Sequence, residues 1–320
     1  MPSLFPEAST PEEYDEVCAD ERRLRPGVRA IGAELDLGER EMVRFPNGSV
    51  PVYAIGEDLV LKIYPPLDRA EHSLEAGVLR SLERRLPIPT PAVHAVGELE
   101  GWTYLLMDRL RGQSLVTAWP RLSEVDRSGL ATQLGEALAA LHALEPPQLE
   151  GLCIDWPGFV AEQHRTAAER QRRWGLSEAW REQIPEFLDG VELGDGGARA
   201  LLHTEVMREH LLVDQSGSRW VFSGLFDFEP AMVGAPEYEF AAVGLFFSCG
   251  EARLLRRVLL AYGYRAAALD GALERRLLAY ALLHRYSHLP WYLKRLPPPP
   301  GTTNLAALAG LWWGVSATGH

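Results

Sequence analysis

The chain has 320 residues, of which 47% are hydrophobic, so it is long enough to bury a substantial core. Its 44 Asp and Glu residues outnumber its 32 Lys and Arg residues, and the formal net charge of −12 disfavours nucleic acids and anionic membranes as partners while favouring polar or cationic small molecules. Three widely spaced cysteines indicate neither a disulfide framework nor a zinc motif, and no membrane span or secretory signal is visible, so we expect a cytoplasmic protein.

The N-terminal third has the pattern of a small sheet with one helix inserted into it. Apolar residues at helical spacing predict a leading helix over residues 11–25 and the inserted helix over residues 68–85. The short connection at residues 56–58 predicts a hairpin, and Pro51 favours an edge position for its first strand. Runs of β-branched and aromatic residues predict four strands, over residues 49–55, 59–64, 92–97 and 102–109.

Beyond residue 110 the pattern changes to helices and loops. Amphipathic periodicity predicts a helix over residues 125–143, a helical pair within 159–189 and two or three helices within 251–293. We therefore predict an α+β protein with two domains, residues 1–110, including the leading helix, and residues 111–320.

Lys62 stands in a predicted strand that is otherwise apolar. If the strand is central in its sheet, the buried ammonium needs a carboxylate or a phosphate to offset its desolvation. Glu75 follows in the inserted helix, and an ion pair with it would direct Lys62 towards nucleotide phosphates. The alternative is an edge strand from which Lys62 reaches water.

Two loops of this region are candidates for contacts with a nucleotide. The first is a turn with Asn47, Gly48 and Ser49, whose backbone N–H groups suit a phosphate, although an ordinary hairpin turn accounts for the same residues. The second links the two domains and offers its backbone to a purine edge, although any such connector has a similar composition. Its residues are Met107, Asp108 and Leu110.

Two polar motifs follow in the C-terminal half, His203-Thr-Glu-Val-Met-Arg-Glu-His210 and Phe226-Asp-Phe-Glu229. Taken in order with the lysine strand, the glutamate helix and the Leu-Leu-Met-Asp link, they resemble the aminoglycoside phosphotransferases and choline-kinase-like small-molecule kinases, relatives of the protein kinases. The resemblance implies a two-lobed protein-kinase-like fold. Its small N-terminal lobe would be an antiparallel sheet with one helix, and its large C-terminal lobe would be mainly helical.

Within this family the chain is similar to the hygromycin B phosphotransferases that modify the 7''-hydroxyl, through residues 60–64, 104–112 and 173–176. The resemblance implies transfer of the γ-phosphoryl group of ATP, with GTP left open, to a hydroxyl of an aminoglycoside such as hygromycin B or of a similar sugar-like alcohol. It also implies that Lys62 holds the α- and β-phosphates and that Glu75 orients Lys62.

The family's catalytic pattern is His-Gly-Asp-x-x-x-x-Asn, and this chain carries Thr204, Glu205 and His210 at its Gly, Asp and Asn positions. The resemblance implies that Glu205, one methylene longer than Asp, is the base. It implies that Asp227 and His210 hold the metal ion. Because an imidazole nitrogen suits Mn²⁺ better than Mg²⁺, the metal preference is left open between them.

For the acceptor, the carboxylates of Glu229 and Glu237 would complement a cationic sugar, and Trp291 and Tyr292 would offer flat faces to its rings. The alternative for the aromatic residues is an ordinary place in the core. Glu239 matches the Asp with which the family supports its catalytic loop.

Two functions follow from the sequence. The first is a phosphotransferase, which the retention of Lys62, Glu75 and Asp227 favours. The second is a pseudokinase or nucleotide-binding regulatory protein that has lost phosphoryl transfer, which the changes at Glu205 and His210 favour.

Overall fold

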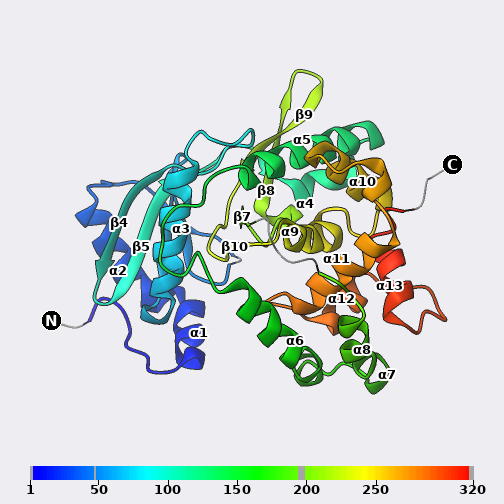
Figure 1. Cartoon of the computed structure of the whole chain (residues 1–320). Helices are drawn as coiled ribbons and strands as arrows, with labels where there is room; N and C mark the ends of the chain where they lie inside the picture. The colour runs from blue at the N-terminus through cyan, green and yellow to red at the C-terminus, as the bar shows by residue number, and fades with distance from the viewer. Residues whose placement is uncertain (1–2, 47, 194–198, 317–320) are drawn as a thin grey trace. The chain divides into compact units, whose positions relative to one another are not determined.

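The computed structural model describes residues 3–46, 48–193 and 199–316, and the chain divides into two compact units (Figure 1). The N-terminal unit comprises Met1–Arg85, Pro89–Arg111 and Phe226–Glu229. The C-terminal unit comprises Leu86–Ile88, Gly112–Leu225 and Pro230–His320. A short segment from late in the sequence, Phe226–Glu229, is therefore part of the N-terminal unit.

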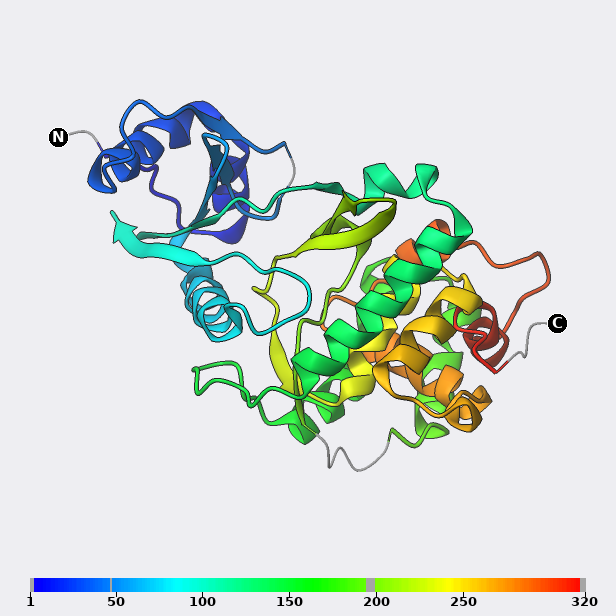
Figure 2. The same cartoon turned by 90° about the horizontal axis from the view of Figure 1, so that it is seen from above.

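A five-stranded antiparallel sheet forms the centre of the N-terminal unit, in the order β1-β2-β3-β5-β4. Figure 2 shows α1 and α2 (blue) on one side of this sheet and α3 (cyan) on the other. The strands are β1 (Met42–Arg44), β2 (Val52–Ile55), β3 (Leu59–Tyr64), β4 (Val93–Leu99) and β5 (Trp102–Asp108). The helices are α1 (Pro11–Ala19), α2 (Glu21–Glu34) and α3 (Arg69–Leu82).

Alternation along β3 assigns its side chains to two faces. Leu61 and Ile63 belong to the apolar core that includes residues of α1 and α2. Lys62 and Tyr64 point to the opposite face, where both bond to Glu75 of α3. The period of two in the strand thus places Lys62 and Tyr64 beneath α3.

The predicted hairpin, the inserted helix and the two later strands of the sheet are confirmed. The single leading helix over residues 11–25 is wrong, because Asp20 separates α1 from α2 and accepts the Arg22 N–H with its side chain at 3.0 Å. The described residues of this unit consequently form three α-helices, where the sequence predicted two.

The edge position predicted from Pro51 is also wrong. The strand β1, which the sequence pattern does not predict, pairs with β2 and takes the edge. Pro51 precedes β2 and contributes only its carbonyl, which accepts the Ile63 N–H at 2.9 Å. The missing N–H of proline therefore costs the sheet no hydrogen bond.

The C-terminal unit is mainly helical, as predicted, and the helices expected within residues 125–143, 159–189 and 251–293 are present. Its helices are α4 (Leu115–Ala118), α5 (Glu124–His142), α6 (Trp156–Arg173), α7 (Glu178–Arg181), α8 (Gln183–Asp189), α9 (Pro236–Ala242), α10 (Ala252–Tyr262), α11 (Gly271–Leu283), α12 (Leu289–Arg295) and α13 (Leu305–Trp312). None of the described helices is long and apolar enough to cross a membrane.

Two small antiparallel sheets in this unit were not expected from the sequence. One pairs β7 (Ala200–Leu202) with β10 (Met232–Gly234) and leads directly into His203. The other contains β6 (Gln113–Ser114), β8 (Leu211–Ser216) and β9 (Arg219–Leu225). The segment from residue 203 to residue 210 therefore runs between two strands that fix both of its ends.

Close packing of α5 on α10 depends on the absence of a side chain at Gly135. A Cβ there would overlap the Val258 carbonyl and lie 2.8 Å from Ala261 Cβ. We expect Gly135→Ala to lower the free energy of unfolding by roughly 1–3 kcal/mol, the usual cost of overpacking a core. Gly129 on the same helix has no atom within 4 Å of a Cβ, so Gly129→Ala should leave stability unchanged or raise it by up to about 1 kcal/mol.

Urea unfolding of the two variants and the parent protein measures this difference. Equal stability of Gly135→Ala and Gly129→Ala would show that the two helices separate at no cost.

Candidate functional site

A buried lysine and three carboxylates form one cluster in the N-terminal unit. Only 4% of the Lys62 surface is exposed, and its Nζ lies 2.9 Å from Glu75 Oε2, 2.7 Å from Asp227 Oδ1 and 2.9 Å from Glu229 Oε2. Because β3 is a central strand, the alternative in which Lys62 reaches water from an edge is wrong. The predicted ion pair with Glu75 is present, and two further carboxylates join it.

The electrostatics of this cluster keep Lys62 charged. Burial alone would lower the pKa of Lys62, but the surrounding acidic groups, Glu75 foremost, raise that pKa well above its ordinary value. Burial raises the pKa of Glu229, and the nearby Lys62 ammonium opposes that shift. With one ammonium among three carboxylates, the cluster attracts further positive charge.

Glu75 is the carboxylate of this cluster with the most hydrogen-bond donors around it. It is fully buried and accepts hydrogen bonds from Lys62, from the Tyr64 hydroxyl and, at 3.2 Å, from the Phe228 N–H. The last bond ties the segment Phe226–Glu229 to α3. Asp227 itself has a positive φ of 71°, a conformation that Asp tolerates better than most residues.

The same carboxylates are suited to a divalent cation. Ligand atoms of Glu75, Asp227 and Glu229 all lie within 4.8 Å of one another, and carboxylate oxygens are the ligands that Mg²⁺ prefers. Glu75 is already held by Tyr64 and Phe228, whereas the side chains of Asp227 and Glu229 keep 30% and 19% of their surface exposed. The donor set therefore fits a metal ion, chiefly through Asp227 and Glu229.

In the C-terminal unit, Glu239 of α9 holds the first residue of the loop 203–210 through a hydrogen bond. Glu239 is fully buried, and its Oε2 accepts the His203 N–H at 2.7 Å and lies 3.5 Å from His142 Nε2. Thr204 follows with a φ of 71°, which is strained for a β-branched residue. Its hydroxyl donates to the Pro230 carbonyl at 3.2 Å, which fixes the loop in that conformation.

His210 bonds back to the start of its own loop. Its Nδ1 lies 2.9 Å from the Glu205 carbonyl oxygen, and its ring centroid is 6.0 Å from that of His203. Neighbouring Glu209 forms an ion pair with Arg295 at 3.2 Å, so its carboxylate is directed to α12. The geometry makes His210 a brace for the backbone of Glu205, and metal coordination by His210 would have to use Nε2.

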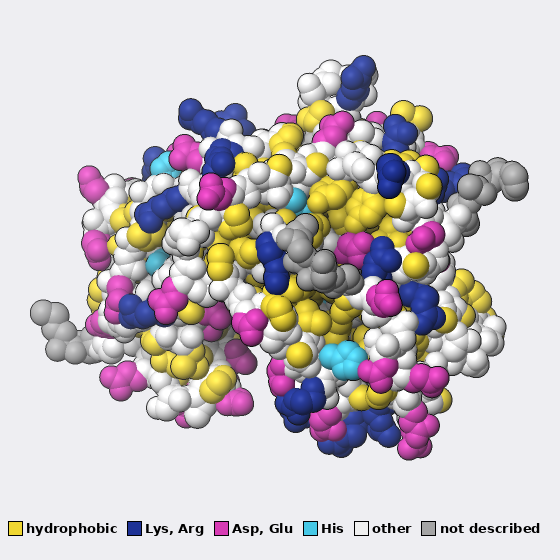
Figure 3. Space-filling model, viewed as in Figure 1, with side chains coloured by type: hydrophobic (Ala, Val, Ile, Leu, Met, Phe, Trp, Pro, Cys, Tyr) yellow, Lys and Arg dark blue, Asp and Glu magenta, His cyan; other side chains and the backbone are white. Residues whose placement is uncertain are grey.

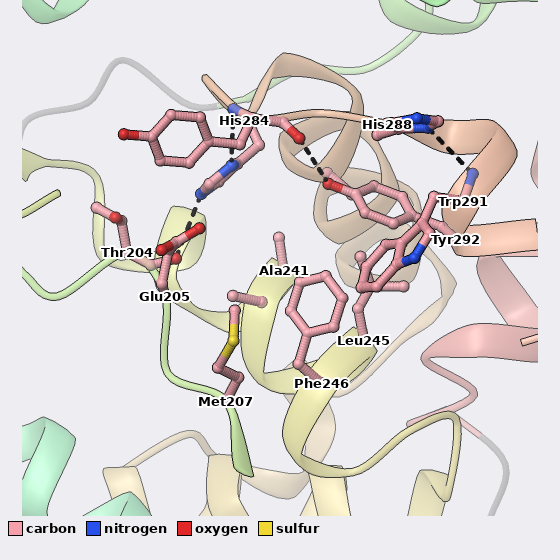
Figure 4. A pocket seen from close by; sticks show the side chains of 13 residues that line it. Thr204, Glu205, Met207, Ala241, Leu245, Phe246, His284, His288, Trp291 and Tyr292 are labelled. Carbon is pink, nitrogen blue, oxygen red and sulfur yellow. Dashed lines mark hydrogen bonds between the residues drawn. The ribbon is translucent and has the colours of Figure 1, made fainter. Parts of the chain in front are cut away.

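A pocket of about 350 Å³ opens beside Glu205 within the C-terminal unit. Figure 4 shows Glu205 and Met207 on one side of it and Phe246, Trp291 and Tyr292 on the other. Phe246 belongs to a turn of π-helix, Val243–Phe247, that extends α9. The aromatic ring of Phe246 thus reaches the pocket wall from a π-helical turn, a conformation that is frequent at functional sites.

The structure separates the residues predicted to bind the acceptor. Trp291 and Tyr292 line the pocket with Glu205. Glu237 instead forms a bidentate ion pair with Arg276, at 2.7 and 2.9 Å, and Glu229 belongs to the lysine cluster of the N-terminal unit. Phe246, Met207 and His284 also line the pocket, but no sequence signal distinguished them from ordinary core residues.

The two loops predicted to contact a nucleotide lie at strand ends in the N-terminal unit. Gly48 and Ser49 lie in the turn between β1 and β2, and Asn47 is outside the described residues. Met107 and Asp108 end β5, and Leu110 follows it. The Asp108 N–H donates to the Ala92 carbonyl at 2.9 Å, so an amide that reads a base must come from later in the link, as the prediction for Leu110 requires.

His284 forms a neutral part of the pocket wall. Its Nε2 lies 3.3 Å from the Thr204 carbonyl, and its ring stacks on Tyr238 with centroids 4.9 Å apart. Burial lowers the pKa of His284 to about 4. The pocket therefore gains no positive charge from this residue near neutral pH.

This burial predicts a contribution of His284 to acid sensitivity. Between the ordinary pKa near 6.5 and the folded value of about 4, the unfolded chain binds a proton that the folded protein does not, so stability falls as the pH falls through this window. From pH 7 to pH 5 we expect the parent protein to lose about 1–2 kcal/mol more than His284→Gln. Urea unfolding at both pH values measures this loss. The control is His288→Gln, which changes a partly exposed residue of the same pocket. Equal losses in the parent and His284→Gln would contradict the assignment.

Residues 41–279 match the model of the phosphotransferase enzyme family. No curated protein matches the sequence.

Solved structures give the fold. The chain is similar to the GDP complex of aminoglycoside 2'-phosphotransferase IIIa, with 17% identity and a TM-score of 0.70 over 86% of this chain and 97% of that one. It is similar to the streptomycin–ATP ternary complex of APH(2'')-IIa, with 18% identity and a TM-score of 0.60 over 79% of this chain and 88% of that one. It is also similar to the aminoglycoside 3'-phosphotransferase of type VIII, with 23% identity and a TM-score of 0.59 over 80% of this chain and 96% of that one. The predicted protein-kinase-like fold is thereby confirmed.

Proposed function

Because the chain belongs to the phosphotransferase enzyme family, it is a phosphotransferase that acts on a hydroxyl group, and we propose that it transfers the γ-phosphoryl group of ATP or GTP to an aminoglycoside or a similar sugar-like alcohol. The family assignment favours this function over a regulatory protein without activity. Hygromycin B is the first acceptor to test, because the short sequence similarities favour the enzymes that modify its 7''-hydroxyl.

The position of Glu205 is the observation that carries this proposal. Its carboxylate is on the wall of a pocket large enough for a sugar-sized alcohol, near the start of a loop that Glu239 and His210 hold in place. A carboxylate so placed can accept the proton of an acceptor hydroxyl as its oxygen attacks phosphorus. Fixing the backbone on both sides of Glu205 keeps that oxygen within hydrogen-bond reach.

The N-terminal unit supplies groups of the kind that a nucleotide requires. In this proposal residues 1–110 bind the nucleotide, with Lys62 on its phosphates, Glu75 as the residue that orients Lys62, and the turn with Gly48 and Ser49 over the phosphates. The backbone of Met107, Asp108 and Leu110 meets the base. Residues 111–320 hold the acceptor.

The metal ion belongs to the same proposal. Asp227 is the principal ligand, and His210 is a ligand only through Nε2, since Nδ1 is bonded to the Glu205 carbonyl. Glu229 offers a second carboxylate beside Asp227. When bound, Mg²⁺ or Mn²⁺ would neutralise charge on the transferring phosphoryl group.

The base assignment predicts a selective loss of turnover. Glu205→Ala should lower phosphoryl transfer by about 10²- to 10⁴-fold, the usual contribution of a positioned base, and leave nucleotide binding intact. Transfer is measured as a single phosphoryl adduct by mass spectrometry with ATP or GTP and hygromycin B or other aminoglycosides, and binding is measured as a thermal shift. Unchanged turnover would show that another residue is the base, and the absence of any thermal shift with either nucleotide would remove the nucleotide from the proposal.

The metal assignment predicts a change of preference in His210→Asn. An amide oxygen in place of an imidazole nitrogen should raise the affinity for Mg²⁺ relative to Mn²⁺, because Mg²⁺ prefers oxygen ligands. Thermal shifts with each metal in the presence of nucleotide measure this ratio independently of activity. A ratio equal to that of the parent protein would leave His210 only its hydrogen bond to the Glu205 backbone.

A further inference from the structure

The pocket beside Glu205 has a composition that does not suit a polycation. Within the described part of the chain, its lining contains Glu205 as the single carboxylate and neither lysine nor arginine. The remaining wall is aliphatic and aromatic, apart from Thr204 and two histidines. Burying several ammonium groups against such a wall carries a desolvation cost that one carboxylate cannot offset.

Glu237, which the sequence offered for a cationic acceptor, is already engaged, and so are two other acidic residues of this unit, Glu209 and Glu239. Glu237 is held by both arms of the Arg276 guanidinium, Glu209 by Arg295, and Glu239 is buried against the backbone of the catalytic loop. On the face shown in Figure 3, acidic and basic side chains are interspersed, and no broad acidic field covers it. Among the described residues that line the pocket, Glu205 is therefore the carboxylate that a bound acceptor meets.

A positive charge also lies against the aromatic wall. The Arg295 guanidinium is 5.5 Å from the centroid of the Phe246 ring and 5.3 Å from that of Trp291. These rings thus already have a cationic neighbour, whose charge is offset by Glu209 at 3.2 Å. Their exposed surface is left for apolar contacts, and Trp291 keeps 42% of its area accessible.

We infer that the acceptor is a neutral or singly charged alcohol with an apolar or aromatic ring body, which packs against Phe246 and Trp291 while its hydroxyl meets Glu205. This inference rests on the proposed function and narrows its acceptor within the sugar-like alcohols. The oxygen of the hydroxyl forms a bond to the γ-phosphorus, the bond from that phosphorus to the bridging oxygen of the nucleoside diphosphate breaks, and the hydroxyl proton passes to Glu205.

Four probes test the acceptor class with the full chain, ATP or GTP, and Mg²⁺ or Mn²⁺. Phenyl and octyl β-D-glucopyranoside carry apolar bodies, methyl β-D-glucopyranoside lacks one, and kanamycin is a polycation. We expect phosphorylation of the phenyl or octyl glucoside with a kcat/KM at least about tenfold above that of both other probes, the value of roughly two buried methylene groups. The preference should change little with ionic strength, because no multiple charge pairing is involved.

Variants of the wall locate the effect. Trp291→Ala should raise the KM for the preferred glucoside by about 3- to 10-fold with little change in kcat, as expected for a lost aromatic contact. Trp291→Phe should bring the KM most of the way back to that of the parent protein. Leu311→Ala removes an apolar side chain of equal exposure on α13, outside the pocket, and should change neither constant.

Three results would overturn the inference: kanamycin as the best acceptor, equal turnover of the three glucosides, or turnover of no glucoside. Transfer to kanamycin or hygromycin B that depends on Glu205 would leave the proposed phosphotransferase standing while removing its narrowed acceptor. Loss of nucleotide binding and of all transfer would remove both.

Discussion

The buried ammonium of Lys62 is the constraint on which the N-terminal unit depends. An ammonium that is 4% exposed is tolerated only if carboxylates surround it, and three do so here, from α3 and from the segment Phe226–Glu229. The Phe228 N–H bond to Glu75 adds a backbone tie to the same carboxylate. A four-residue segment from late in the chain is thereby made part of a sheet domain that is otherwise complete by residue 111. Replacement of one carboxylate would leave the others, but removal of the ammonium would leave a buried excess of negative charge.

Local physical rules explain why part of this arrangement could be predicted. The period of two along β3 and the cost of burying an unpaired ammonium require a partner for Lys62, and Glu75 is near enough in sequence to be identified. Asp227 and Glu229 could not be paired with Lys62 in the same way, because no periodicity links residues so far apart. The edge strand β1 was missed because it has only three residues. The edge position predicted from Pro51 was wrong because Pro51 precedes β2, where the sheet uses its carbonyl as an acceptor and needs no N–H from it.

The two residues of the loop 203–210 that depart from the family pattern, Glu205 and His210, are physically linked. The Glu205 side chain is longer than Asp, and the His210 imidazole holds the Glu205 carbonyl at 2.9 Å. The longer Glu205 side chain samples more rotamers than an Asp would, and a fixed backbone reduces the volume over which its carboxylate oxygen can move. The sequence shows these as separate departures from the family pattern. Only the fold brings the imidazole of His210 to the backbone of Glu205, and in the proposed mechanism the second change would compensate for the first.

Net charge and site charge are different quantities in this protein. The value of −12 favours cationic partners for the whole chain, yet in the C-terminal unit Glu237, Glu209 and Glu239 each have a specific partner, and none of them lines the pocket. Unpaired surface carboxylates interact with a ligand at the pocket only through water and salt, which screen charges beyond about 10 Å. The pocket wall contacts a bound acceptor directly, and there the cost of desolvating the acceptor's charges outweighs their attraction to distant carboxylates. Apolar complementarity at Phe246 and Trp291 therefore decides the acceptor class, although composition alone favours the opposite choice.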